Sequence, residues 1–228
     1  MLLSIIRQNQ KLAAKRNPAF DRNRFAKFLI YFMVAFWAAY LIFIGVMLSF
    51  AFEDIFPSME PYHIMNQGLI YLLILDFLLR FMLQPAMSQE IKPYLLMPVK
   101  KNKLVDTLLL QSGISSYNFF WFFLIIPFAL LTIIRFYGLT GILCYLCGIW
   151  LLMVMNSYWY LICKTLLNEK LLYILLPIGV YGLLAGTEFI PEGNPVSTFM
   201  MNLGEGFIEG NILAFLGVIA AILLLLLV

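Results

Sequence analysis

Residues 28–52 read FLIYFMVAFWAAYLIFIGVMLSFAF, a run of 25 residues without a charged side chain. An α-helix needs about 20 consecutive apolar residues to cross a bilayer, so this stretch predicts a membrane-spanning helix. The composition of the chain agrees: 63% of its 228 residues are hydrophobic and only 12% are charged. Soluble domains carry about 25% charged residues. A bilayer accommodates this excess of apolar side chains, whereas a water-soluble core does not.

Five further apolar segments follow, at residues 63–84, 117–134, 139–163, 171–190 and 211–228. We therefore predict an all-α polytopic membrane protein with six transmembrane helices in residues 28–228. Residues 1–27 are basic and weakly amphipathic, which predicts an interfacial helix, although a disordered basic tail is the alternative. Residues 191–210 begin with turn chemistry and contain an apolar patch too short to span, which predicts an outer interfacial or re-entrant segment.

The cations divide the predicted loops into two groups. Residues 1–27 hold seven of the 15 Lys and Arg residues, the loop from Arg80 to Lys103 holds five, and Lys164 and Lys170 add two. The remaining cation is Arg135, and the other loops are acidic. Because Lys and Arg concentrate in cytoplasmic loops, we expect a cytosolic N-terminus. The final apolar run reaches Val228 without an anchoring residue, so we also expect the native chain to continue further.

Asp76 and Arg80 interrupt the second predicted span. Their i, i+4 spacing puts them on one helix face within pairing distance. An ionisable residue inside the membrane indicates a functional site by default, which would place Asp76 in the transport path, but the spacing favours a structural pair. Pro177, with glycines near it in the fifth span, is a further candidate for the transport path, since proline can kink a helix into a hinge. The alternative for Pro177 is ordinary helix packing.

Signatures of soluble enzymes are missing from the sequence. It contains no G-x-x-x-x-G-K-[ST] phosphate loop, no HExxH and no nucleophile elbow, so we predict that the chain is not an enzyme. The Cys144-x-x-Cys147 pair lacks a second pair of ligands, and His63 is a poor candidate, so no metal site is expected. Asn156 and Ser157 favour interhelical hydrogen bonds over chemistry. No basic and aromatic pattern supports nucleic-acid binding.

The loop between the second and third spans is longer and more apolar than a connector needs to be. Residues 88–103 read SQEIKPYLLMPVKKNK, in which the apolar core YLLM lies between Pro93 and Pro98. An exposed apolar patch on a charged loop indicates a contact surface, here for a cytosolic partner. Residues 103–112 read as a helix that leads from this loop into the third span.

The sequence YLLMPVKKNKLV at residues 94–105 resembles the stretch that follows the coupling helix in membrane subunits of ABC-2-type exporters. Large uncharacterised ABC permeases of Bacteroidota look similar over the whole predicted topology. The chain departs from the family pattern at Gln89-Glu-Ile-Lys92, where many members have E-x-G-T. The resemblance implies a multi-pass protein of the bacterial cytoplasmic (inner) membrane.

The resemblance also implies a partner and a mechanism. A coupling loop at residues 85–106 would dock on a separate cytosolic ABC ATPase, which would bind the ATP and magnesium, while this chain would need no cofactor. A second permease unit, from a homodimer or from a longer chain, would complete a path for export of an unknown substrate. The residues implied to contact the ATPase are Ile91, Pro93, Tyr94, Leu95, Leu96, Met97, Pro98, Lys100 and Lys101.

Two other functions stay open on the sequence alone. An ion- or proton-coupled secondary transporter would use Asp76 and would need no ATPase. A non-transporting membrane scaffold would use the same apolar loop to recruit a cytosolic protein.

Overall fold

The computed structural model describes residues 24–84, 101–187 and 194–227, together with Ser4, Ile6, Gln8, Asn9, Leu12 and Tyr94. Every regular element among these residues is a helix, so the prediction of an all-α fold is confirmed. The helices are α3 (Arg24–Ile55), α4 (Pro61–Gln67), α5 (Leu69–Leu83), α7 (Lys101–Gly113), α8 (Tyr117–Phe120), α9 (Phe122–Thr132), α10 (Ile134–Glu169), η2 (Leu171–Ile174), α11 (Leu175–Gly186), α12 (Pro195–Ile208) and α13 (Ile212–Leu227).

Two helices, Lys27–Ile55 and Ile134–Glu169, are long and apolar enough to cross a membrane. Three bent pairs raise the number of candidate spans in the described residues to at most five, because each pair reaches the necessary length only when its halves are joined. The pairs are α4 with α5 (bent by 49°), residues 103–120 with α9 (59°), and α12 with α13 (116°). The apolar helix Leu171–Gly186 is shorter. Helices suited to a membrane are therefore present, but the number six is not confirmed.

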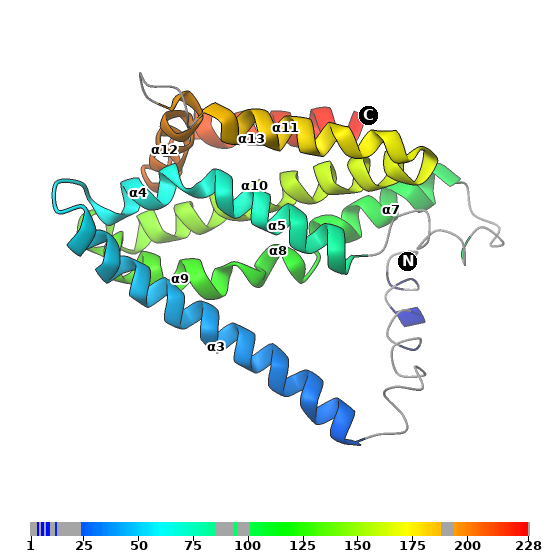
Figure 1. Cartoon of the computed structure of the whole chain (residues 1–228), viewed down its shortest axis with the longest axis horizontal. Coiled ribbons are helices and arrows are strands. Elements are labelled where there is room, and N and C mark those ends of the chain that lie inside the picture. Colours follow the sequence, from blue (N-terminus) through cyan, green and yellow to red (C-terminus); the bar gives the residue numbers. More distant parts are fainter. Residues whose placement is uncertain are drawn as a thin grey trace.

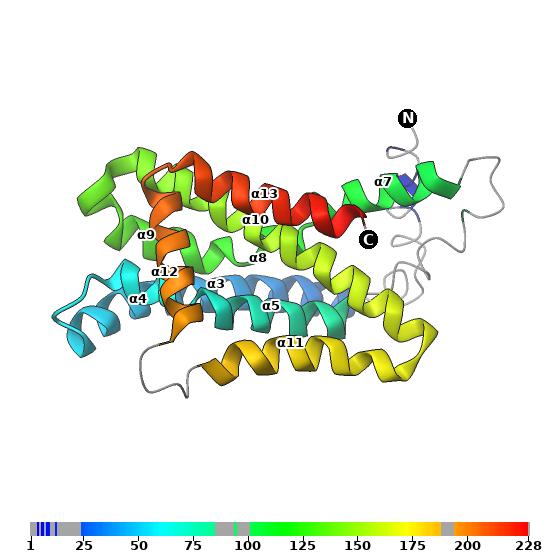
Figure 2. The ribbon, with the colours of Figure 1, turned by 90° about the horizontal axis from the view of Figure 1, so that it is seen from above.

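The helix α10 forms the centre of the bundle (Figures 1 and 2) and packs against α5, α7, α8, α9, α12 and α13. Its side chains Tyr145, Ile149 and Met153 are fully buried, as are Phe128 of α9 and Phe207 of α12. In contrast, α3 contacts the bundle through its C-terminal half on α9 and diverges from it toward its N-terminal end (Figure 1). The core is therefore built around α10, and most of α3 lies outside it.

Two glycines with positive φ set the bends at one end of the bundle. Gly138, at φ 62°, breaks α10 immediately before the predicted span at residues 139–163 begins. Gly210, at φ 73°, follows α12, and the amide of Asn211 donates to the Gly206 carbonyl at 2.7 Å. Left-handed backbone costs little only for glycine. This turn lays α12 across the end of the bundle that also holds the end of α3 and the start of α4 (Figure 2).

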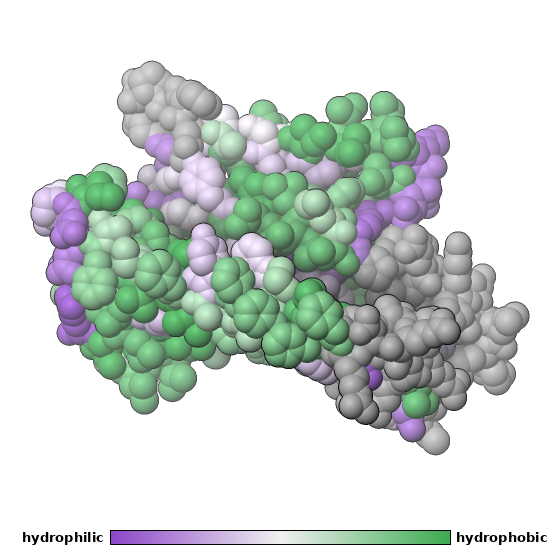
Figure 3. All heavy atoms as spheres, turned by 60° about the horizontal axis from the view of Figure 1, so that its bottom comes forward, coloured by the Kyte–Doolittle hydropathy of each residue, from purple (hydrophilic) through white to green (hydrophobic). Residues whose placement is uncertain are grey.

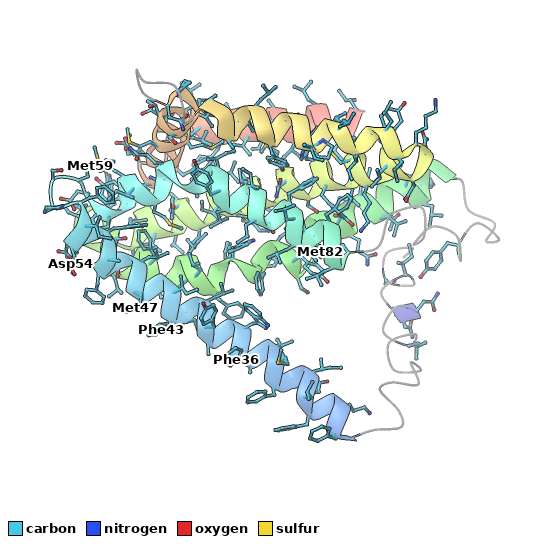
Figure 4. All side chains as sticks on the ribbon, in the orientation of Figure 1. Phe36, Phe43, Met47, Asp54, Met59 and Met82 are labelled. Atoms are coloured by element: carbon cyan, nitrogen blue, oxygen red, sulfur yellow. The ribbon has the colours of Figure 1, made fainter. Side chains whose placement is uncertain are left out.

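The face of the molecule drawn in Figure 3 is largely apolar along its middle. Figure 3 shows an apolar band over the visible face, with polar residues gathered at its left edge. Phe36, Phe43 and Met47, which are labelled along α3 in Figure 4, are each about half exposed. Exposed side chains of this size and number suit contact with lipid rather than with water.

Candidate functional site

Asp76 and Arg80 lie one turn apart on α5 and form a buried ion pair. The Nε of Arg80 donates to Oδ2 of Asp76 at 2.6 Å. The two residues are 3% and 1% exposed. The sequence therefore placed this pair correctly on one helix face, and the bundle encloses both members.

Two other segments contact Asp76 directly, and a third contacts the pair through Asn156. The indole Nε1 of Trp121, between α8 and α9, donates to Oδ1 of Asp76 at 2.9 Å. The amide Nδ2 of Asn156 on α10 donates to Oδ2 of Asp76 at 2.7 Å and to the Leu73 carbonyl at 2.9 Å. The hydroxyl of Tyr181 on α11 donates to Oδ1 of Asn156 at 2.9 Å. We call Asp76, Arg80, Trp121, Asn156 and Tyr181 the Asp76 cluster.

The Asp76 cluster offsets a large desolvation cost. Removing a charged pair from water costs several kcal/mol per ion, which only good geometry and further hydrogen bonds recover. Three donors surround Asp76, but Arg80 is less well matched. Both of its terminal nitrogens, Nη1 and Nη2, are buried without a hydrogen-bond partner. In the cluster, both oxygens of the Asp76 carboxylate accept hydrogen bonds, whereas the Arg80 guanidinium donates only through Nε.

A second cation lies at the same end of α5. Lys164 of α10 donates from Nζ to the carbonyl oxygens of Phe81, at 2.8 Å, and Gln84. Tyr160 donates to the same Gln84 carbonyl at 2.8 Å. Cations and hydroxyl donors at a helix C-terminus satisfy carbonyl groups that have no partner inside the helix. These contacts fix the end of α5 on α10, one turn beyond Arg80.

The helix α7 lies at the same end of the bundle as the C-terminus of α5. Its buried residues Leu104 and Leu108 form a small apolar cluster with Ile6 and Tyr94, separate from the main core. Its other end is bonded to α10, because the Tyr158 hydroxyl donates to the Leu109 carbonyl at 3.1 Å. The hydroxyls of Ser112 and Ser157 are also 2.8 Å apart. Since Ser157 follows Asn156 in the chain, α7 is connected through α10 to the Asp76 cluster.

A further polar contact joins α4 to α12 at the opposite end. Nδ1 of His63 lies 2.5 Å from Oε1 of Glu205, with both side chains about one-quarter to one-third exposed. The Tyr145 hydroxyl donates to Oδ1 of the buried Asn66 at 2.9 Å. The His63–Glu205 contact attaches α12 to α4, and the Tyr145–Asn66 bond attaches α4 to α10.

Few of the residues implied to contact an ATPase fall in the described part of the chain. Tyr94 packs on Leu104 and Leu108, and Lys101 begins α7. Pro177 is the buried third residue of α11, one turn before Tyr181, so it lies at the start of a helix rather than in its middle. The remaining residues lie outside the described ranges: Ile91, Pro93, Leu95, Leu96, Met97, Pro98 and Lys100.

Sequence reasoning predicted interhelical hydrogen bonds for Asn156 and Ser157, and both residues form them. It did not connect Trp121 or Tyr181 with Asp76. The only signal was an indole N–H and a phenol O–H in apolar segments, since such groups find hydrogen-bond partners when buried. Within the described residues, no group of three or more His, Cys, Asp or Glu side chains could hold a metal ion.

Comparisons with curated proteins and with solved structures gave no match. A family match covers residues 10–228, which is nearly the whole chain. The chain therefore belongs to the family of unknown function DUF5687.

Proposed function

We propose that the chain is the membrane-spanning subunit of an ABC-2-type exporter, driven by ATP hydrolysis in a separate cytosolic ATPase. The observation that carries this proposal is the position of α7. This helix joins the segment 85–100, which would receive the ATPase, to the centre of the bundle. A push on that segment would be applied to a helix already bonded to α10.

The route from α7 to the bundle is short. Tyr158 donates a hydrogen bond to the Leu109 carbonyl of α7, and Ser157 shares one with Ser112 of α7. The adjacent Asn156 bonds to Asp76 on α5 and to Tyr181 on α11. A displacement of α7 would therefore shift α10 relative to α5 and α11. Coupling between distant sites travels through packed elements with alternative arrangements, and this set of bonds supports such an element.

The direct test is affinity purification of the full chain from its native membrane in mild detergent, with and without Leu95→Asp combined with Leu96→Asp. We expect a nucleotide-binding ATPase to copurify with the wild type and not with the double variant. A matched control is Leu171→Asp combined with Leu172→Asp, at residues that are 81% and 71% exposed near the end of α10. The control should keep the ATPase, because it adds the same charges outside the loop.

Copurification of the ATPase with both double variants would overturn the docking site. If a cytosolic partner copurifies but the complex hydrolyses no ATP in proteoliposomes, the scaffold function would be favoured instead. Stimulation of ATP hydrolysis by a transported compound would exclude the scaffold.

A gradient-driven carrier that uses Asp76 is the second candidate, favoured by the burial of that carboxylate. Hard cations need several converging oxygen ligands. Asp76 is instead approached by three nitrogen donors, from Arg80, Trp121 and Asn156. Uptake or efflux driven by an ion gradient without ATP, and lost in Asp76→Asn, would favour the carrier over the exporter.

A further inference from the structure

The strongest unexplained feature of the bundle is the free end of the Arg80 guanidinium. Arginine has five N–H donors, of which the Nε donor bonds to Asp76. Nη1 and Nη2 are both buried without a partner, and the side chain is 1% exposed. Other unpartnered buried atoms in the described residues belong to neutral side chains and occur singly. In the described part of the chain, only Arg80 leaves two donor atoms of a charged group unmatched, and unmatched charged donors carry the largest burial cost.

The charge around Arg80 favours an anion. Arg80 lies one turn before Gln84, at which α5 ends, and Lys164 lies against the same helix end. The carboxylate of Asp76 accepts from Arg80, whereas Lys164 donates to backbone carbonyls and Glu169 at the end of α10 is exposed. Among the described residues, these two cations are therefore accompanied by one buried carboxylate. A group with two oxygens fits the planar fork of a guanidinium through paired hydrogen bonds.

The depth of Arg80 suits a headgroup rather than a molecule at the bilayer centre. Four residues of helix correspond to about 6 Å, so the guanidinium is close to the helix end where headgroups lie. Basic sites between membrane helices at this level bind acidic lipid headgroups. The rings of Phe77 and Tyr181, 4.9 Å apart, would contact an apolar body attached to such a headgroup.

The helix α11 provides the side from which a ligand would enter. It lies beside α5 and α10 (Figure 2), and Pro177 is its only buried residue. A polar contact between α11 and the bundle is the bond from Tyr181 to Asn156. Added Cβ atoms at Gly179, Gly182 and Gly186 would meet nothing within 4 Å. On this side, the Asp76 cluster is therefore covered by α11, a helix with few contacts to the bundle.

From these observations we infer that the Arg80 fork binds the phosphate or carboxylate group of an acidic membrane amphiphile, between α5 and α11. Arg80 contacts the oxygens through Nη1 and Nη2, Asp76 holds the guanidinium in place through Nε, and Lys164 adds positive charge. The inference concerns binding alone and holds whether or not the chain works with an ATPase.

The test uses the purified full chain in a neutral maltoside detergent, with lipid binding measured by native mass spectrometry. The probe is dioleoyl phosphatidylglycerol, and dioleoyl phosphatidylcholine serves as the comparison. We expect tighter binding of the acidic lipid to the wild type. Asp76→Asn combined with Arg80→Gln should weaken that binding about tenfold, the effect expected for loss of a charge-assisted contact. This double variant adds no net charge, and the single side-chain oxygen of its asparagine can still accept from either Trp121 or Asn156.

The matched control neutralises an exposed Glu–Arg ion pair in the same way. Arg135 and Glu53 are 3.5 Å apart and more than half exposed at the other end of the bundle. Glu53→Gln combined with Arg135→Gln should leave lipid binding unchanged. Arg80→Lys is a second test variant, because it keeps a charge beside Asp76 but removes the fork.

Weaker binding of phosphatidylglycerol by either Arg80 variant, with wild-type helix content by circular dichroism, supports the inference. The inference is overturned if both the Asp76→Asn, Arg80→Gln double variant and Arg80→Lys fold and bind phosphatidylglycerol as tightly as the wild type. Competition by millimolar sodium phosphate would identify a site open to free oxyanions as well. Its failure to compete would identify a site that needs the lipid body.

Discussion

The helices α3 and α10 are both long, apolar and able to span a membrane, yet they occupy opposite positions in the molecule. The most apolar stretch of Lys27–Ile55 is 11% buried, and that of α10 is 44% buried. Hydropathy alone does not separate them. The difference lies in their polar side chains. Tyr145, Asn156, Tyr158 and Tyr160 of α10 all bond to other segments, whereas Ser49 of α3 donates to the Val46 carbonyl of its own helix.

This contrast has a physical basis in the apolar solvent that a membrane provides. Lipid tails are as apolar as leucine, so two helices gain little from burying apolar surface against each other. Close packing and interhelical hydrogen bonds then decide which helices associate. On this basis, polar substitutions in the centre of the bundle should cost far more than changes on α3.

The largest loss of stability is expected for Asp76→Ala. It leaves the buried Arg80 without its counter-charge and removes the acceptor used by Trp121 and Asn156. Breaking a buried ion pair by removing one partner costs about 3–5 kcal/mol. Unfolding in mixed micelles of maltoside and SDS would measure the change. Asp54→Ala, at the exposed end of α3 (Figure 4), should stay within about 0.5 kcal/mol. Similar losses for both would mean that the Asp76 pair does not hold the bundle.

A smaller loss is expected for Gly45→Ala, at the place where α3 contacts the bundle. A Cβ there would lie 2.2 Å from the Leu124 carbonyl oxygen of α9. Because backbone atoms must move to admit the methyl group, we expect a loss of about 1–3 kcal/mol.

The control for Gly45 is Gly179→Ala on α11, where a Cβ would meet nothing within 4 Å. Alanine favours a helix over glycine by about 0.8–1.0 kcal/mol, so this variant should melt at or slightly above the wild-type temperature. A wild-type melting temperature for Gly45→Ala would show that α3 is not attached at this point.

A loss of about 1 kcal/mol is expected for Tyr181→Phe, which removes one hydrogen bond to Asn156. The sharper measurement is hydrogen exchange. Exchange should become faster in α11 and stay unchanged in α5, because the lost bond joins α11 to the bundle. Tyr173→Phe on the preceding η2 turn is the matched control. Equal exchange in the two variants would mean that packing alone holds α11.

Much of this architecture could be predicted from the sequence because apolar length is a local property. Residues 28–52 lie within α3, and residues 139–163 lie within α10 from the break at Gly138 onward. The pairing of Asp76 with Arg80 was also accessible, since i, i+4 spacing on a helix is enough to bring two side chains together.

The rest depends on contacts between distant residues. Trp121 and Asn156 are 45 and 80 residues from Asp76, and no periodicity relates them. The bends at Gly68 and Gly210 divide two predicted spans or their approaches into shorter helices. The pairing of His63 with Glu205 follows from the fold of α12 over α4, which a single sequence does not specify.

The smallest effect is expected on α3, for Phe36→Leu. Phe28, Phe32, Phe36 and Tyr40 stack in a row along α3, with neighbouring ring centroids 6.1 to 6.4 Å apart. Such i, i+4 pairs contribute about 0.2–0.5 kcal/mol each, and Phe36 is 53% exposed, so the loss should stay below about 1 kcal/mol. Phe128→Leu, at a fully buried ring on α9, should cost clearly more. Equal losses in thermal unfolding would mean that α3 is packed against another surface in the membrane, and α3 and α10 would then no longer differ in the way their burial indicates.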